Sequence, residues 1–81
     1  MTEAALTVFV RSGCHLCEEM LRDLEPWRRE VGFELQVVDI DGDAALEAKY
    51  GARVPVLAGG ENELCQFSLD EHAVRQYFGG R

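Results

Sequence analysis

Two cysteines separated by two residues are the side chains of this sequence best suited to chemistry. Cys14 and Cys17 lie in the stretch R-S-G-C-H-L-C, directly after the apolar run at 4–10. Two thiols at this spacing can bind a metal, form a structural disulfide, or cycle between dithiol and disulfide. With 3 cysteines in 81 residues, the chain is too poor in cysteine for a disulfide-stapled scaffold. In a reducing compartment, a catalytic or metal-binding pair is therefore favoured.

The residues around the pair predict a strand, a turn and a helix. Residues 5–10 are rich in β-branched and aromatic side chains and are expected to form a buried strand, which the turn at 11–13 ends. From Cys14 onward, apolar residues recur at helical spacing with charged residues between them. Pro26 lacks an N–H group, so we expect it to kink or end this helix between residues 24 and 28.

The rest of the chain predicts three more strands and two more helices. We expect a strand at 33–40, then a helix at 44–50 that is capped by 41–43 and stopped by Gly51. A proline-led strand at 54–58, a turn at 59–62 and a strand at 63–67 should follow. The last helix should be capped by Ser68 or Asp70, end at Gly79–Gly80, and bury Ala73, Val74, Tyr77 and Phe78.

The resulting order, β-α-β-α-β-β-α, predicts an α/β fold. The first two strands, joined through a helix, should pair in parallel with a right-handed crossover, and the last two, joined by a short turn, must be antiparallel. We therefore expect one domain spanning 1–81, with a mixed four-stranded sheet flanked by helices.

Composition limits the classes of binding partner that we expect. The net charge of −7 argues against nucleic acid and anionic membranes, because both are negatively charged. The first ten residues carry no basic segment and too short an apolar stretch to span a bilayer. The prediction is a monomer in the cytoplasm with neither nucleic-acid nor membrane partners.

Redox chemistry suits the predicted position of the cysteines. At a helix N-terminus, unpaired N–H groups and the helix dipole stabilise a thiolate, so Cys14 is the candidate nucleophile. Cys17 lies three residues later on the same side of the first turn and is the candidate resolving thiol. His15 is interpreted either as a charge that favours the thiolate or as a solvated side chain, while Glu18 and Glu19 disfavour the thiolate. Cys65 is interpreted as a small buried hydrophobe rather than a second redox thiol.

With this pattern in hand, the chain resembles the glutaredoxin-like branch of the thioredoxin superfamily over essentially its whole length. The resemblance is carried by the C-x-x-C, the element order and the stretch V-V-D-I-D-G-D-A-A-L-E-A-K-Y-G-A-R-V-P-V-L. It implies that Pro55 is a cis proline beside the cysteine pair, and that the Val54 backbone binds a peptide or glutathione as a short antiparallel strand.

The resemblance also implies residues that bind glutathione. Arg11 stands where glutaredoxins commonly carry a lysine for the glutathione carboxylate, and Arg53 is either a second positive contact or a surface arginine. Ser68 and Asp70 are the counterparts of residues that bind the glutamyl end. The sequence departs from the family in having His15 and Leu16 where a proline and an aromatic residue are usual.

These residues predict a small thiol–disulfide oxidoreductase acting on protein disulfides or glutathione mixed disulfides. No tightly bound cofactor or metal is expected, and glutathione is a candidate co-substrate. Two alternatives remain open from the sequence. In the first, two subunits share an iron–sulfur cluster or zinc through Cys14; in the second, the fold serves protein interaction and the cysteines are passive.

Overall fold

The computed structural model describes residues 5–79, and within them it contains three helices and four strands. In chain order these are β1 (Ala5–Val10), α1 (His15–Val31), β2 (Glu34–Asp39), α2 (Ala44–Tyr50), β3 (Val56–Gly59), β4 (Asn62–Gln66) and α3 (Glu71–Gly79). This order confirms the predicted α/β class. Of the predicted domain, residues 1–4, 80 and 81 lie outside the described residues, and with them Gly80 of the expected last helix end.

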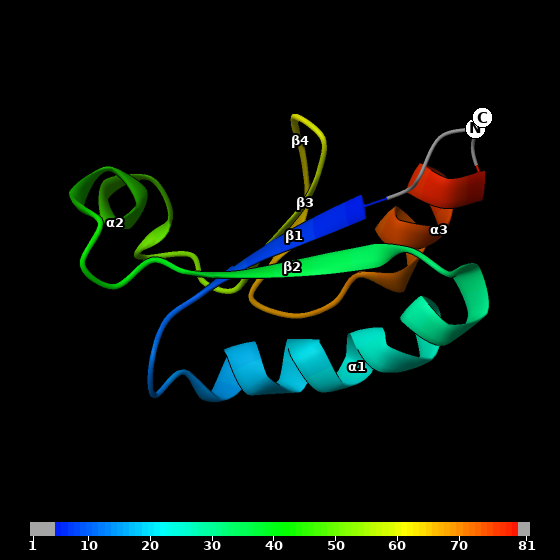
Figure 1. Cartoon of the computed structure of the whole chain (residues 1–81), viewed down its shortest axis with the longest axis horizontal. Helices are drawn as coiled ribbons and strands as arrows, with labels where there is room; N and C mark the ends of the chain where they lie inside the picture. Colours follow the sequence, from blue (N-terminus) through cyan, green and yellow to red (C-terminus); the bar gives the residue numbers. More distant parts are fainter. Residues whose placement is uncertain (1–4, 80–81) are drawn as a thin grey trace.

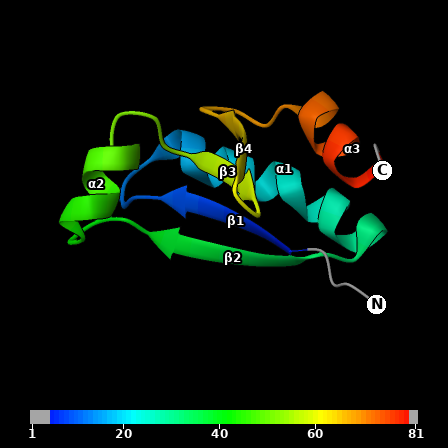
Figure 2. The same cartoon turned by 90° about the horizontal axis from the view of Figure 1, so that it is seen from above.

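The four strands form one mixed sheet in the order β2-β1-β3-β4. β1 runs parallel to β2, with Val8 opposite Val37, and β3 runs antiparallel to both β1 and β4. Figure 1 shows α1 running alongside the sheet, with α2 at one end of the molecule and α3 at the other. In Figure 2 the two edge strands, β2 and β4, lie on opposite sides of the central pair.

The main core lies on the side of the sheet covered by α1 and α3. Leu6 and Val8 of β1 pack there with Met20 and Leu24 of α1 and Val74 of α3, and all five are almost completely buried. Because alternate residues of a strand face opposite sides, β1 contributes every second residue to this core. Burial of these apolar side chains fixes α1 against the sheet.

A smaller core lies on the other side of the sheet, beneath α2. Phe9, adjacent to Val8 in β1, belongs to this cluster together with Ile40, Tyr50 and Val56. The rings of Phe9 and Tyr50 stack with centroids 4.1 Å apart. This contact holds the short helix α2 next to the end of β1 that leads to the cysteines.

Side-chain caps define where α2 and α3 begin. Asp43 Oδ1 accepts a hydrogen bond from Leu46 N at 3.1 Å, and Asp70 Oδ1 accepts one from Ala73 N at 3.2 Å. Of the two predicted caps for the last helix, Asp70 is therefore the one in use. α2 ends at Tyr50 as predicted, immediately before Gly51.

The third strand begins later than the sequence predicts. Val54 and Pro55 precede it, and it extends to Gly59, which the sequence assigns to the turn. A Cβ atom at Gly59 would lie 2.6 Å from Cζ of Tyr77, so a larger residue there would require this ring to shift. The turn between β3 and β4 is consequently reduced to residues 60 and 61.

Pro26 does not end α1, so of the two predicted effects between residues 24 and 28, a kink or an end, the end is contradicted. The helix continues to Val31 with the proline inside it. Leu24 on one side of Pro26 is fully buried, and Trp27 on the other side packs against the main core. Gly32, with φ 85°, then closes the helix in the left-handed conformation. Packing on both sides of the proline outweighs the local cost of the missing N–H.

Replacing Pro26 tests whether packing of α1 outweighs the cost of the missing N–H. Pro26→Ala restores a helical N–H donor and removes the ring from an exposed helix position, so we expect the free energy of unfolding to rise by about 1–3 kcal/mol. Urea denaturation measures the change, with Glu30→Ala on the same helix as a control expected to stay within about 0.5 kcal/mol. A loss of stability in Pro26→Ala would mean that the proline acts chiefly by restricting the unfolded chain.

Candidate functional site

The two cysteines occupy the first turn of α1. Cys14 is the N-cap, with extended backbone angles, and Cys17 lies one turn inward, with 5.2 Å between the two Cα atoms. The two sulfurs are joined in a disulfide, and the backbone N–H of Cys17 donates to Cys14 Sγ at 3.1 Å. In a dithiol form, an N–H in this position would stabilise the charge of a Cys14 thiolate.

The two sulfurs differ in their access to solvent. Cys17 is only 3% exposed, whereas Cys14 is half-buried. Cys14 is therefore the more accessible of the two residues, and Cys17 is buried with the core residues. This placement matches the sequence prediction, while the roles of nucleophile and resolving thiol stay predictions.

His15 lies on the surface beside Cys14. Its Nε2 atom is 2.9 Å from a carboxylate oxygen of Glu19, and its side chain is 79% exposed. The carboxylate is one helical turn away, so it competes with the Cys14 sulfur for any positive charge on the imidazole. The structure places His15 at the rim of the site.

Arg11 is tied to the segments around it. Its Nε donates to Asp41 Oδ1 at 3.2 Å and its Nη1 donates to the carbonyl oxygen of Gly51 at 3.0 Å. Its Nη2 lies 3.8 Å from Glu47 Oε2. A glutathione carboxylate would have to compete with two protein carboxylates for this guanidinium.

Arg53 is likewise held by protein groups. Its guanidinium donates to both carboxylate oxygens of Glu63, at 2.8 and 3.2 Å, and to Gln66 Oε1 and the Lys49 carbonyl oxygen, each at 3.0 Å. These contacts join α2 to β4, and they raise the pKa of Arg53 through its hydrogen bonds to Glu63. The structure thus gives Arg53 a clear role in joining elements.

The connection between α2 and β3, which contains Val54 and Pro55, lies at the same end of the molecule as the start of α1 (Figures 1 and 2). The peptide bond between Val54 and Pro55 is cis, and Pro55 is buried. The Pro55 carbonyl oxygen accepts from the Phe67 N–H at 2.9 Å. Within residues 5–79, no hydrogen bond uses the N–H or C=O of Val54, which leaves its backbone open to an added strand.

Ser68 and Asp70 lie between β4 and α3, where the structure assigns Asp70 to capping. The Ser68 backbone N–H donates to the Gln66 carbonyl oxygen at 2.8 Å, and the Ser68 side chain is exposed. Because one Asp70 carboxylate oxygen accepts from Ala73 N, that oxygen already serves the helix. Both residues are exposed, and Asp70 is the one whose side chain is used to cap a helix.

Phe67 is a site residue that the sequence analysis missed. Its φ is 72°, and the bond from Ser68 N to Gln66 O makes it the central residue of a γ-turn. A bulky side chain rarely adopts positive φ, and this one is also 44% exposed. Its backbone bond to Pro55 places the strained turn beside the proline. Such strain tends to occur at functional sites, but no sequence pattern announces it here.

Two substitutions at Phe67 separate the strain from the ring. We expect Phe67→Gly to be more stable to unfolding than Phe67→Ala by about 1 kcal/mol, because both remove the ring and only glycine tolerates positive φ without strain. Thermal or urea unfolding of the two variants gives the difference. If alanine is the better replacement, the position carries no strain of this kind.

The ion pair between Arg53 and Glu63 makes stability depend on pH. Hydrogen bonds from Arg53 hold the pKa of Glu63 below its ordinary value. A depressed carboxyl pKa stabilises the fold above the unfolded pKa of about 4.3, and this contribution is lost as the pH falls through the folded pKa. Glu63→Gln should therefore destabilise the protein at pH 7, and its difference from wild type should shrink toward zero in acid. Urea denaturation across this pH range measures it, and a constant difference would contradict the assignment.

Cys65, the third cysteine, sits in β4 away from the pair. It is half-buried, packs against the main core, and lies opposite Leu57 of β3. Burial raises the pKa of its thiol, which disfavours the reactive thiolate.

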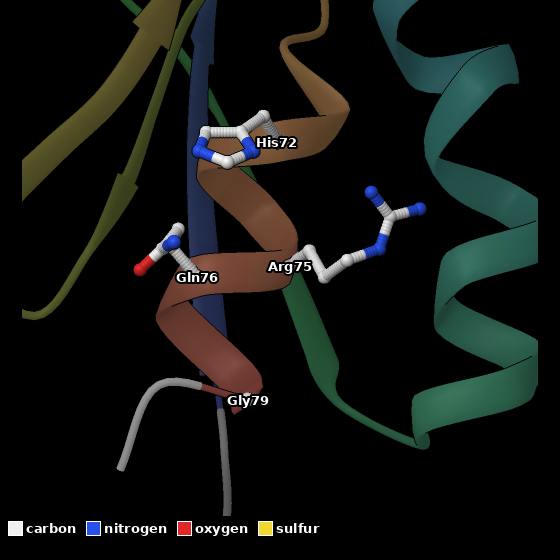
Figure 3. Close-up of a pocket in the computed structure, with 4 residues that line it drawn as sticks. All are labelled: His72, Arg75, Gln76 and Gly79. Atoms are coloured by element: carbon white, nitrogen blue, oxygen red, sulfur yellow. The ribbon is translucent and has the colours of Figure 1, made fainter.

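An open pocket lies at α3, lined by His72, Arg75, Gln76 and Gly79 (Figure 3). Arg75 points from it toward α1, where its guanidinium carbon is 5.4 Å from the ring centroid of Trp27. None of the residues predicted to form the site lines this pocket. This pocket is therefore separate from the cysteine pair.

Neither a metal-binding group of three side chains nor a membrane-spanning helix occurs among the described residues. Among residues 5–79, no group of three or more His, Cys, Asp or Glu side chains is placed to hold a metal ion. In that range no helix combines the length and apolar character needed to cross a membrane.

Solved structures place the fold in a known class. A thioredoxin from Fasciola hepatica, 22% identical, superposes with a TM-score of 0.58 over 94% of this chain and 78% of its own. The protein is thus a thioredoxin-fold protein with a cysteine pair at a helix N-terminus. Residues 5–79 match the family model described as Glutaredoxin-like domain (DUF836), and the chain belongs to this family. The resemblance inferred from the sequence is confirmed.

More similar structures come from two bacterial proteins. Protein Ne2328 from Nitrosomonas europaea is 40% identical and superposes with a TM-score of 0.87, covering 98% of this chain and 95% of its own. Protein XcR50 from X. campestris is 35% identical, with a TM-score of 0.73 over 94% of this chain and 97% of its own. The similarity therefore extends over nearly the whole length of both relatives.

Proposed function

We propose that this protein is a small thiol–disulfide oxidoreductase that reduces disulfides through Cys14 and Cys17, acting as a monomer in the cytoplasm. The observation that carries the proposal is the unequal pair at the start of α1: a half-buried Cys14 Sγ that accepts a backbone N–H, and a buried Cys17 bonded to it. An accessible, stabilised thiolate with a second thiol behind it is the arrangement that disulfide exchange requires.

The proposed reaction passes two electrons to the substrate. The Cys14 thiolate attacks one sulfur of the substrate disulfide, the substrate S–S bond breaks, and the other sulfur leaves as a thiolate that takes up a proton. Cys17 then loses its proton and attacks Cys14 Sγ, which releases the second substrate sulfur. The protein is left with the Cys14–Cys17 disulfide, the form in the structure. A thiol reductant, for which glutathione is the candidate, restores the dithiol.

We favour protein disulfides over glutathione mixed disulfides as the main substrate. Glutathione carries two carboxylates, and the two arginines assigned to hold it, Arg11 and Arg53, are already paired with Asp41 and Glu63. The backbone of Val54 is unpaired among the described residues and would accept an extended peptide next to Cys14, in the manner of an added strand.

Serine variants of the two cysteines test the mechanism. Cys14→Ser should abolish reduction of a disulfide-bonded protein such as insulin, because the attacking thiolate is lost. Cys17→Ser should accumulate a mixed disulfide between Cys14 and the substrate, because nothing resolves it. Turnover and intact mass measure the two outcomes, with Cys65→Ser as a control expected to retain activity. Undiminished turnover in Cys14→Ser would remove the proposal.

The redox equilibrium of the pair and the choice of substrate provide a second readout. In glutathione buffers of varied poise, the wild-type pair should show a single transition near about −200 to −270 mV. Reduction of a protein disulfide should also be faster than reduction of a glutathionylated peptide. A pair that stays oxidised at every poise would be a structural disulfide, and a faster reaction with the glutathionylated peptide would reverse the substrate preference.

A further inference from the structure

Three segments far apart in the sequence meet at the end of the sheet that carries Cys14. They are the turn at 11–13, the turn at 40–43 that follows β2, and the segment at 51–55 that leads into β3. The hydrogen bonds that join them converge on one carboxylate, that of Asp41, and on the guanidinium of Arg11.

Asp41 uses both carboxylate oxygens to hold the turn before Cys14. Oδ1 accepts from Arg11 Nε at 3.2 Å, and Oδ2 accepts from the Ser12 backbone N–H at 3.1 Å. Asp41 is itself oriented, because its own N–H donates to Asp39 Oδ1 at 2.9 Å. The carboxylate therefore bridges the turn after β2 and the turn that presents the nucleophile.

The hydrogen bond from Ser12 to Asp41 matters because few other contacts restrain Ser12 and Gly13. Within residues 5–79, neither Ser12 nor Gly13 makes a backbone–backbone hydrogen bond. Gly13 has φ 72°, and no atom lies within 4 Å of where its Cβ would be. Glycine is the residue with the most backbone freedom. Without Asp41, the turn would keep, among the described residues, only the contacts of Arg11 with Gly51 and Glu47. Ser12 and Gly13, which lead directly to Cys14, would then be less restrained.

Arg11 extends the same network to the segment that precedes β3. Its Nη1 donates to the Gly51 carbonyl oxygen at 3.0 Å. A Cβ on Gly51 would lie 2.5 Å from the Glu47 carbonyl oxygen and 3.5 Å from Arg11 Nη1, so the approach fits a glycine. From Gly51 the chain continues to Val54 and Pro55, the residues proposed to bind the substrate backbone.

We propose that Asp41 is a positioning residue of the redox site, which fixes the turn carrying Cys14 relative to the segment carrying Val54 and Pro55. This inference rests on the proposed function and adds to it a residue that does not touch the reacting sulfurs. The hydrogen bond from Ser12 N–H and the guanidinium of Arg11 lower the pKa of Asp41, which keeps the carboxylate charged at neutral pH.

Removal of the carboxylate should impair substrate turnover more than thiol reactivity. For Asp41→Ala we expect kcat/KM with a peptide containing an internal disulfide to fall about 10- to 100-fold, the cost of a misplaced reacting group. Alkylation of reduced Cys14 by iodoacetamide, measured by mass at the pH plateau, should change less than about twofold, because a small reagent needs no docking. Asp41→Asn keeps the shape and one acceptor, so it should lie between wild type and Asp41→Ala.

The matched control is Glu25→Gln, which also removes a carboxylate from an exposed ion pair with an arginine. Glu25 pairs with Arg28 at 3.2 Å, farther along α1 from the cysteines, and kcat/KM should stay within about twofold of wild type. The double variant Arg11→Ala/Asp41→Ala should be no worse than the more impaired of its two single variants, because the two residues act as one unit. Additive losses would contradict this coupling.

Several outcomes would overturn the inference and leave the function intact. One is that Asp41→Ala is as active as an active wild type. Another is that Asp41→Ala loses reactivity toward iodoacetamide in parallel with kcat/KM. The third is that Glu25→Gln loses as much kcat/KM as Asp41→Ala. An inactive wild type would instead overturn the proposed function, and the positioning role with it. Amide hydrogen exchange gives a readout independent of activity, because Ser12 N–H should exchange faster in Asp41→Ala than in Glu25→Gln. If Asp41→Ala does not fold, Asp41→Asn carries the same measurements.

Discussion

The hydrogen bond from the Cys17 N–H to Cys14 Sγ is the interaction on which the site depends. It exists only because a helix begins at this point, where the first N–H groups have no partner within the helix. That helix is held in place by Met20 and Leu24, which are buried in the main core next to β1. The position of the half-buried Cys14 is thus supported by apolar contacts about two and three turns farther along the same helix.

The topology of the sheet brings Asp41, Val54 and Pro55 to the same end of the sheet as Cys14. β1 and β2 are parallel, so the turns that follow them, carrying Cys14 and Asp41, emerge at the same edge. β3 is antiparallel to β1, so its beginning, preceded by Val54 and Pro55, lies at that edge as well. Three loops meet without any long excursion of the chain. The smaller core beneath α2 and the contacts between the loops, among them the Arg11 and Asp41 pair, then set their mutual geometry.

The sequence predicts the features that depend on local pattern. Hydrophobic periodicity gives the order of the elements, and the position of Cys14 between a strand and an amphipathic helix gives its place as N-cap. The pairing of Arg11 with Asp41 was not predictable, because 30 residues separate the two and either could equally face solvent. Pro26 shows the opposite error, since a reliable local rule is overruled by burial of Leu24 and Trp27 around it. The strained φ of Phe67 has no signature in composition or spacing.

The pairing of charges around the site bears on which substrate it suits. A chain with a net charge of −7 repels a small anion unless free cations stand at the binding site. Here the guanidiniums of Arg11 and Arg53 are engaged by Asp41, Glu47 and Glu63, so they contribute to holding loops together more than to attracting anions. Under the proposed function, substrate recognition would fall to groups without charge, namely the Val54 backbone and the exposed side chains of Leu16 and Phe67. Such groups suit an extended polypeptide, because its backbone supplies hydrogen bonds and its side chains supply apolar contacts.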